Sequence, residues 1–98
     1  MSADSGAQDR AEQIAAAVCS LPGVAGLHGG MFGEVGTYLP GRRVVGVRIG
    51  ESRVAVHVSL VLDAPVLDTA AAVRTAAQQV VALPVDVTVE DIVPESFS

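Results

Sequence analysis

The sequence predicts an α+β two-layer sandwich, in which two helices cover one face of a mixed sheet of about four strands. Two observations carry this prediction. Apolar residues alternate strictly with other residues from Val54 to Leu62, which is the pattern of a strand with one buried face. Two segments of helical periodicity flank the expected strands and give the element order α-β-β-β-α-β.

Proline and glycine mark the ends of the expected elements. Leu21-Pro22-Gly23 ends the first helix and Pro84 ends the second, because proline lacks the N–H that continues a helix. Gly50-Glu51-Ser52 separates two apolar runs in the manner of a tight hairpin. The expected elements are helices over residues 9–20 and 66–83 and strands over residues 24–28, 44–49, 54–62 and 85–90.

A chain of 98 residues is predicted to form one domain. The domain is expected over residues 9–92, which contain the helical and strand patterns. Residues 1–8 are mostly small and polar and are expected to form a disordered tail, and residues 93–98 are expected to form a frayed tail.

The composition excludes several kinds of chemistry. All six basic residues are arginine, so the chain has no lysine for a Schiff base or a Walker-type phosphate loop. The formal net charge of −5 opposes general nucleic-acid binding, which needs clustered cations against the phosphates. The N-terminus lacks the layout of a signal peptide, and no apolar run is long enough to span a bilayer. A cytoplasmic location is therefore expected, without a cofactor and without direct membrane insertion.

Cys19, His28 and His57 are the only cysteine and histidines, and they fall on different expected elements. A metal site needs converging ligands, and no CxxC, HxH or HExxH pattern is present. No metal site is therefore expected. A cysteine beside the apolar stripe of a helix is usually a small core residue, and this role is expected for Cys19. A small enzyme that pairs Cys19 with a histidine is an alternative, although no orienting partner is evident.

The segment Gly30-Met31-Phe32-Gly33 has the GxxG spacing with which KH domains clamp a nucleic-acid backbone. In KH domains this motif joins two helices, whereas here it follows an expected strand and contains no basic residue. The pattern therefore favours a flexible turn that folds Met31 and Phe32 onto the core. A KH-like nucleic-acid-binding domain is the alternative, and it needs one surface that carries Arg42, Arg43, Arg48 and Arg53.

The glycine-rich loop over residues 29–41 is the best candidate for a functional site. It is too apolar for a free surface loop, and long irregular loops tend to be functional or to cover a core. Its apolar side chains either cap an open edge of this domain or are buried against another chain. Four of the arginines lie within twelve positions, where they suit an acidic partner or ordinary solvation. The candidate partner contacts are Met31, Phe32, Tyr38, Leu39, Arg42, Arg43, Arg48, Arg53 and His57.

The face of the sheet opposite the helices is expected to be polar. It is a second candidate contact surface, because nothing in the predicted fold covers it. The side chains expected on this face are Arg48, Arg53, His57, Ser59, Asp86, Thr88 and Glu90.

Several segments between Glu12 and Ile92 follow one another in a specific order. They are I-A-A-A-V, L-P-G-V-A-G-L, the glycine-rich loop, V-x-V-x-I-G, V-x-V-x-V-x-L-V, A-x-x-V-R and V-D-V-T-V-E-D-I. In this order and spacing the chain resembles the alkaline shock protein family of bacterial envelope stress response proteins. The resemblance implies a small cytoplasmic protein of cell-envelope homeostasis, whose relatives associate with membrane-anchored partners and self-assemble. It supplies no catalytic residues.

The function expected from these observations is that of a non-enzymatic protein-interaction module. It would act through self-association as a homo-oligomer, through a membrane-anchored protein partner, or through both. The partner would also bring it to the periphery of the membrane, and no nucleic-acid partner is expected.

Overall fold

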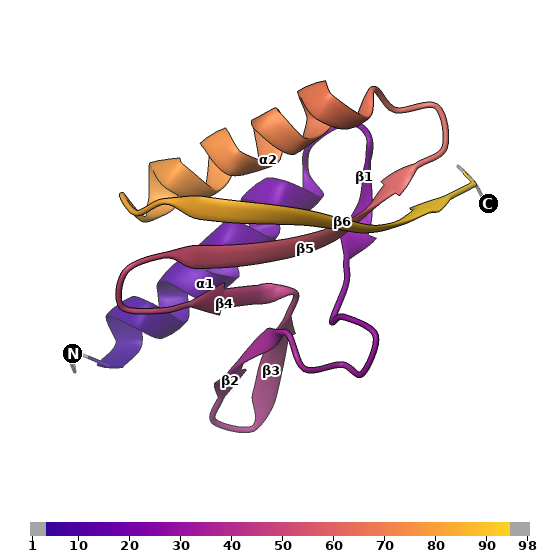
Figure 1. Ribbon diagram of the computed structural model, residues 1–98. Helices are drawn as coiled ribbons and strands as arrows, with labels where there is room; N and C mark the ends of the chain where they lie inside the picture. The colour runs from indigo at the N-terminus through magenta and orange to yellow at the C-terminus, as the bar shows by residue number, and fades with distance from the viewer. Residues whose placement is uncertain (1–3, 95–98) are drawn as a thin grey trace.

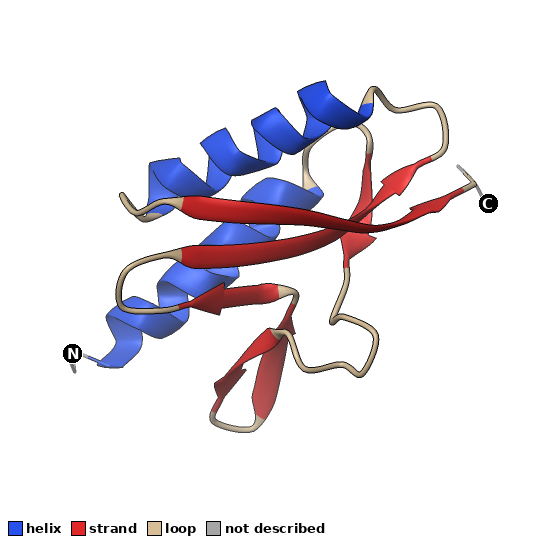
Figure 2. Ribbon diagram, viewed as in Figure 1, coloured by secondary structure: helices blue, strands red, loops and turns tan. Residues whose placement is uncertain are grey.

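The computed structural model describes residues 4–94, and it has the α+β class that the sequence predicts. In Figures 1 and 2, α1 crosses behind the sheet and α2 lies above it beside β6, and no helix lies in front of the sheet, so this front face is open. The elements are α1 Asp4–Cys19, β1 Val24–Leu27, β2 Gly36–Leu39, β3 Arg42–Val45, β4 Val47–Ile49, β5 Val54–Val61, α2 Val66–Val80 and β6 Val85–Val93.

β5 is the central strand, and its alternation decides which face of the sheet is buried. Val54, Val56, Val58 and Leu60 are fully buried, whereas the residues between them are only partly covered. A strand period of two therefore places one apolar row against the helices, as predicted. β6 pairs with β5 in parallel, and β1 and β4 pair with β5 antiparallel.

β1 and β4 share one edge of β5 and together act as a single interrupted strand. β1 pairs with the second half of β5, and β4 pairs with its first half. At the junction, His28 N–H donates to His57 O and His57 N–H donates to Gly46 O, each at 2.9 Å. The chain between His28 and Gly46 thus leaves the sheet and returns to the same ladder. We call residues 29–45 the excursion.

The core lies between the two helices and the apolar row of β5. Ala11, Ile14 and Val18 of α1 are fully buried, as are Val73 and Ala77 of α2. Their spacing of three and four residues is that of one helical face, which is why a single face of each helix is apolar. Burial of each larger side chain in this layer is favourable by roughly 1.5–3 kcal/mol.

The strand predicted over residues 44–49 is wrong as a single element. Gly46 has a φ of +82°, and it separates β3, which ends at Val45, from β4, which begins at Val47. Alternation predicts Val45 and Val47 on one side of a strand, yet Val45 is exposed and Val47 is fully buried. The cause is the left-handed backbone at Gly46, which redirects the chain and resets the alternation.

The excursion contains a hairpin where the sequence predicts an irregular loop. β2 pairs antiparallel with β3, and Leu39 lies opposite Arg42 across a turn at Pro40-Gly41. Leu39 and Val44 are buried and belong to the core cluster. Part of the excursion therefore packs on its own domain.

The ends of the described chain also differ from the prediction. α1 begins at Asp4, so residues 4–8 are helical where a disordered tail is predicted. β6 continues to Val93, whose carbonyl oxygen accepts a hydrogen bond from Leu62 N–H at 2.7 Å. Residues 1–3 and 95–98, which hold the rest of the predicted tails, lie outside the described residues. No helix within residues 4–94 is long and apolar enough to cross a bilayer.

Candidate functional site

Residues 30–33 of the excursion form a tight turn, which we call the tip. Gly33 N–H donates to Gly30 O at 3.1 Å and closes the turn. Gly30 and Gly33 have φ values of +86° and +72°, which side-chain-bearing residues rarely adopt. Met31 and Phe32 lie between these glycines and are 82% and 86% exposed. The predicted turn is present, but its apolar side chains do not fold onto the core.

Hydrogen bonds from the neighbouring residues hold the tip in place. Gly30 N–H donates to Nδ1 of His28 at 2.9 Å, and Phe32 N–H donates to Oε1 of Glu34 at 3.1 Å. Val35 N–H donates to Gly29 O at 2.8 Å, and the Val35 side chain is buried. The tip is therefore tied to the domain on both sides, and its apolar pair is presented by an ordered backbone.

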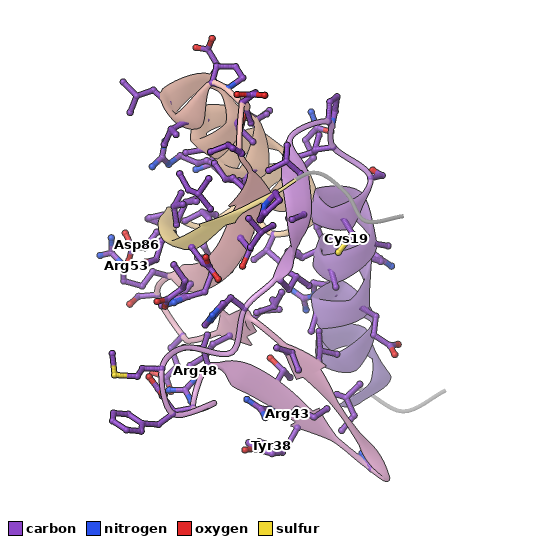
Figure 3. The ribbon with its side chains drawn as sticks, turned by 90° about the vertical axis from the view of Figure 1, so that its right-hand side faces the viewer. Cys19, Tyr38, Arg43, Arg48, Arg53 and Asp86 are labelled. Atoms are coloured by element: carbon purple, nitrogen blue, oxygen red, sulfur yellow. The ribbon has the colours of Figure 1, made fainter. Side chains whose placement is uncertain are left out.

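Two arginines support the excursion through its backbone carbonyl groups. Arg43 donates from its guanidinium group to the carbonyl oxygens of Gly33 and Val35, and it lies over the Tyr38 ring, 5.4 Å from the centroid. Arg48 donates to Glu34 O at 2.8 Å. Figure 3 shows the Arg43 and Tyr38 side chains together on the hairpin. Both guanidinium groups thus position this loop, a role that the sequence does not indicate.

The other predicted contacts of the loop divide between surface and core. Tyr38 is exposed on β2, but Leu39 is buried and cannot meet a partner in this conformation. The side chain of Arg42 lies outside what the structure describes. Glu34 and Thr37 also organise the excursion, and no sequence signal indicates these roles: Glu34 accepts from Phe32 N–H, and Thr37 donates to Val47 O ten positions away.

The open face of the sheet carries two pairs of polar side chains. Arg53 donates to both carboxylate oxygens of Asp86, at 2.7 and 2.9 Å, and this pair is exposed. Nδ1 of His57 lies 2.5 Å from Oε2 of Glu90, and this pair is mostly covered. The hydrogen bond from Arg53 lowers the pKa of the Asp86 carboxyl, and the same bond raises the pKa of Arg53. The predicted polar face therefore exists, with polar side chains of β6 paired to Arg53 and to His57 of β5.

Replacing Asp86 with asparagine is expected to change the thermal midpoint only slightly near neutral pH, because water screens an exposed pair. The lowered pKa means that Asp86 stabilises the fold fully above the pKa of an unfolded aspartate, near about 3.9. This contribution is lost as the pH falls through the lower pKa of the folded state. Thermal denaturation of both chains across acidic pH should show the difference shrinking as the pH falls, and vanishing once Asp86 is protonated in the folded state as well. A difference that persists in acid would show that the charge of Asp86 is not its cause.

Cys19 is exposed at the end of α1, so the predicted core role is wrong. A helix turns by about 100° per residue, which carries position 19 out of the stripe that contains Val18. Figure 3 shows Cys19 on the α1 side of the molecule, away from Arg53 and Asp86. Within residues 4–94, no group of three or more His, Cys, Asp or Glu side chains could hold a metal ion.

No family model, curated protein or solved structure matches this chain. The geometry of the excursion and of the open face is therefore the basis for a functional proposal. Of the predicted contacts, Met31, Phe32, Tyr38 and Arg43 lie in the excursion, and Arg48 on β4 donates to its backbone. Arg53 lies in the turn before β5, and His57 lies on β5.

Proposed function

We propose that this chain is a non-enzymatic protein-interaction module, which binds a protein partner through the tip. The observation that carries the proposal is the exposure of Met31 and Phe32 on a turn whose backbone is hydrogen-bonded on both sides. Single exposed apolar residues are ordinary, but two adjacent large ones on an ordered projection are a typical docking element.

The energetics of burial support this role. Covering each of these two side chains with apolar atoms of a partner would be favourable by roughly 1.5–3 kcal/mol. A turn that is already ordered loses little conformational entropy on binding, so more of this free energy remains as affinity. Because Met31 and Phe32 are adjacent, one apolar pocket on the partner can accept both side chains. Tyr38 is a third large exposed side chain on the excursion.

The resemblance to the alkaline shock protein family supplies the setting of the proposal. The module acts in cell-envelope homeostasis, on the cytoplasmic side of the membrane. The tip docks on a second copy of the chain, on a membrane-anchored protein, or on each in turn.

The KH-like alternative gains no support from the arrangement of these residues. The tip follows β1 and precedes β2, whereas a KH motif joins two helices. Arg43 and Arg48 donate to loop carbonyls, and Arg53 is paired with Asp86. A phosphate backbone would have to displace these partners before it could be neutralised.

Replacing Phe32 with serine is expected to abolish association through the tip and to leave the domain folded, because the side chain contributes little to the core. Mass in solution is measured by sedimentation over a range of concentrations. The parent chain should be larger than a monomer, and Phe32→Ser should be a monomer. Leu67→Ser is the matched control, because Leu67 is 84% exposed on the first turn of α2, and this variant should keep the mass of the parent.

A parent chain that is monomeric at every concentration would remove self-association from the proposal. The membrane-anchored partner is then tested by co-purification from native cells with the parent, Phe32→Ser and Leu67→Ser. An envelope protein that co-purifies with the parent and with Leu67→Ser, but not with Phe32→Ser, supports docking at the tip. Equal recovery with all three chains contradicts it.

A further inference from the structure

The two edges of the sheet are protected to different degrees. On one edge, β1 and β4 are short, β1 contains a register shift, and the excursion leaves between them. Thr37 also donates from Oγ1 to Val47 O at 2.6 Å, which covers a backbone group of β4. On the other edge, β6 runs for nine residues without proline or lysine, and β5 is its only strand partner within residues 4–94. Long edges of this kind are templates for strand addition unless they are blocked.

The hydrogen-bond phase of β6 identifies which backbone groups face outward. Val54 N–H donates to Pro84 O at 2.9 Å, and in a parallel ladder every second residue of a strand faces the same neighbour. Asp86 and Thr88 therefore bond to β5, whereas the N–H and C=O groups of Val87 and Val89 point away from it. Farther back, Val85 O accepts a hydrogen bond from Nε of Arg74 at 3.2 Å, so the open stretch begins after Val85.

The side chains along this edge are of two kinds. On the helix side, Val87 and Val89 pack against the core but remain partly exposed. On the open side, Asp86 is exposed and Glu90 is partly exposed, and the adjacent Asp91 is exposed. A strand added here would place one row of its side chains beside valines and the other row beside carboxylates.

We propose that the outer edge of β6 binds an extended segment of a partner protein in which apolar residues alternate with lysine or arginine. The backbone groups of Val87 and Val89 supply the ladder, and the alternating side chains supply the specificity, as in other cases of strand addition. The tip plays no part in this contact, so the inference goes beyond the proposed function and does not depend on it.

Charge favours a basic segment over a second copy of this chain. β6 carries three acidic residues and no basic one, and the whole chain has a formal net charge of −5. Pairing β6 with β6 of another copy would bring two acidic strands and two acidic domains together. A basic segment is instead attracted by the net negative charge of the domain, while Asp86 and Glu90 keep their pairs with Arg53 and His57.

The probe is a blocked peptide of about ten residues in which valine alternates with lysine, long enough to span β6. A peptide of the same pattern with glutamate in place of lysine is the charge control. Binding at low salt is followed by fluorescence anisotropy, and the site is read from the backbone amide shifts of the full chain. The lysine peptide should bind and should shift amides of β6, whereas the glutamate peptide should not bind.

Two variants test the edge itself. Val87→Pro removes an outward N–H and leaves the N–H groups that face β5. It should therefore lower the affinity for the lysine peptide by about tenfold or more. Thr88→Lys adds a cation to the exposed row of side chains without changing the backbone. It should lower the affinity for the lysine peptide severalfold at low salt, and by a smaller factor at high salt, because salt screens the repulsion. Phe32→Ser should bind the peptide as the parent does.

Several outcomes would overturn the inference. They are amide shifts that map away from β6, a folded Val87→Pro that binds as tightly as the parent, and a Thr88→Lys variant with unchanged binding. Equal binding of the two peptides would reject the basic partner. A parent dimer that Val87→Pro makes monomeric would assign this edge to a second copy instead.

Discussion

Replacing Gly46 with alanine is expected to lower the free energy of unfolding by about 2–4 kcal/mol. The φ of +82° at Gly46 costs a residue with a side chain about 1–2 kcal/mol. An added Cβ would also lie 2.9 Å from His57 O and 2.9 Å from Cβ of Leu27. These atoms belong to the ladder at which β1 and β4 meet, so they cannot withdraw without loosening it. Urea denaturation of the two chains measures the loss.

Gly41→Ala is the matched control for this change. Gly41 has a similar φ of +78°, but an added Cβ there meets nothing within 4 Å. Only the cost of a positive φ for a residue with a side chain applies here, so the free energy of unfolding is expected to fall by about 1–2 kcal/mol. The difference between the two variants isolates the close packing at the junction. Equal losses would show that the interrupted strand can open at Gly46 at little cost.

Replacing Leu60 with alanine is expected to lower the free energy of unfolding by about 2–5 kcal/mol, because its side chain is fully buried and would leave a cavity. Leu62 has the same parity two positions later but is 58% exposed. Leu62→Ala is therefore expected to cost less than about 1 kcal/mol. The same denaturation measurement compares them. A similar loss for both would mean that the core extends past the end of β5.

Leu62 also shows where alternation stops being informative. The sequence pattern places Leu62 in the buried row with Val54 and Leu60. β5 ends at Val61, and the chain then turns toward α2, so the last apolar residue of the pattern leaves the core. Periodicity describes the inside of an element well, whereas its last residue depends on how the next element is reached.

The hairpin of the excursion could have been predicted from its turn. Pro40-Gly41 suits the two central positions of a type II turn, in which proline presets a negative φ and glycine accepts a positive one. Gly41 does have a positive φ, and β2 and β3 pair on either side of it. The flanking strands are short and lack alternation, so a search for alternating apolar residues does not predict this hairpin.

The sequence nominates candidate residues for the site but does not indicate their arrangement. Composition alone singles out Met31, Phe32 and Tyr38, because large apolar side chains are scarce in this chain. Arg43 and Arg48 hold the loop that carries these side chains, because they donate to its carbonyl groups from positions 8 to 14 residues away in the sequence. Leu39 illustrates the opposite result, since it belongs to the same apolar loop and is buried.

The sequence by itself determined the two helices, the long central strand and the face of each that is buried. These features follow from side-chain periodicity within one element, and every residue that decides them is a near neighbour in the chain. Only the tertiary structure decided that β1 and β4 form one interrupted edge, that the excursion turns the Met31–Phe32 pair outward, and that β6 is left with an unpaired side. The first of these outcomes rests on hydrogen bonds between distant segments, which join His28 and Gly46 to His57. Backbone N–H and C=O groups are the same at every residue except proline, so their pairing leaves no mark in the pattern of side chains.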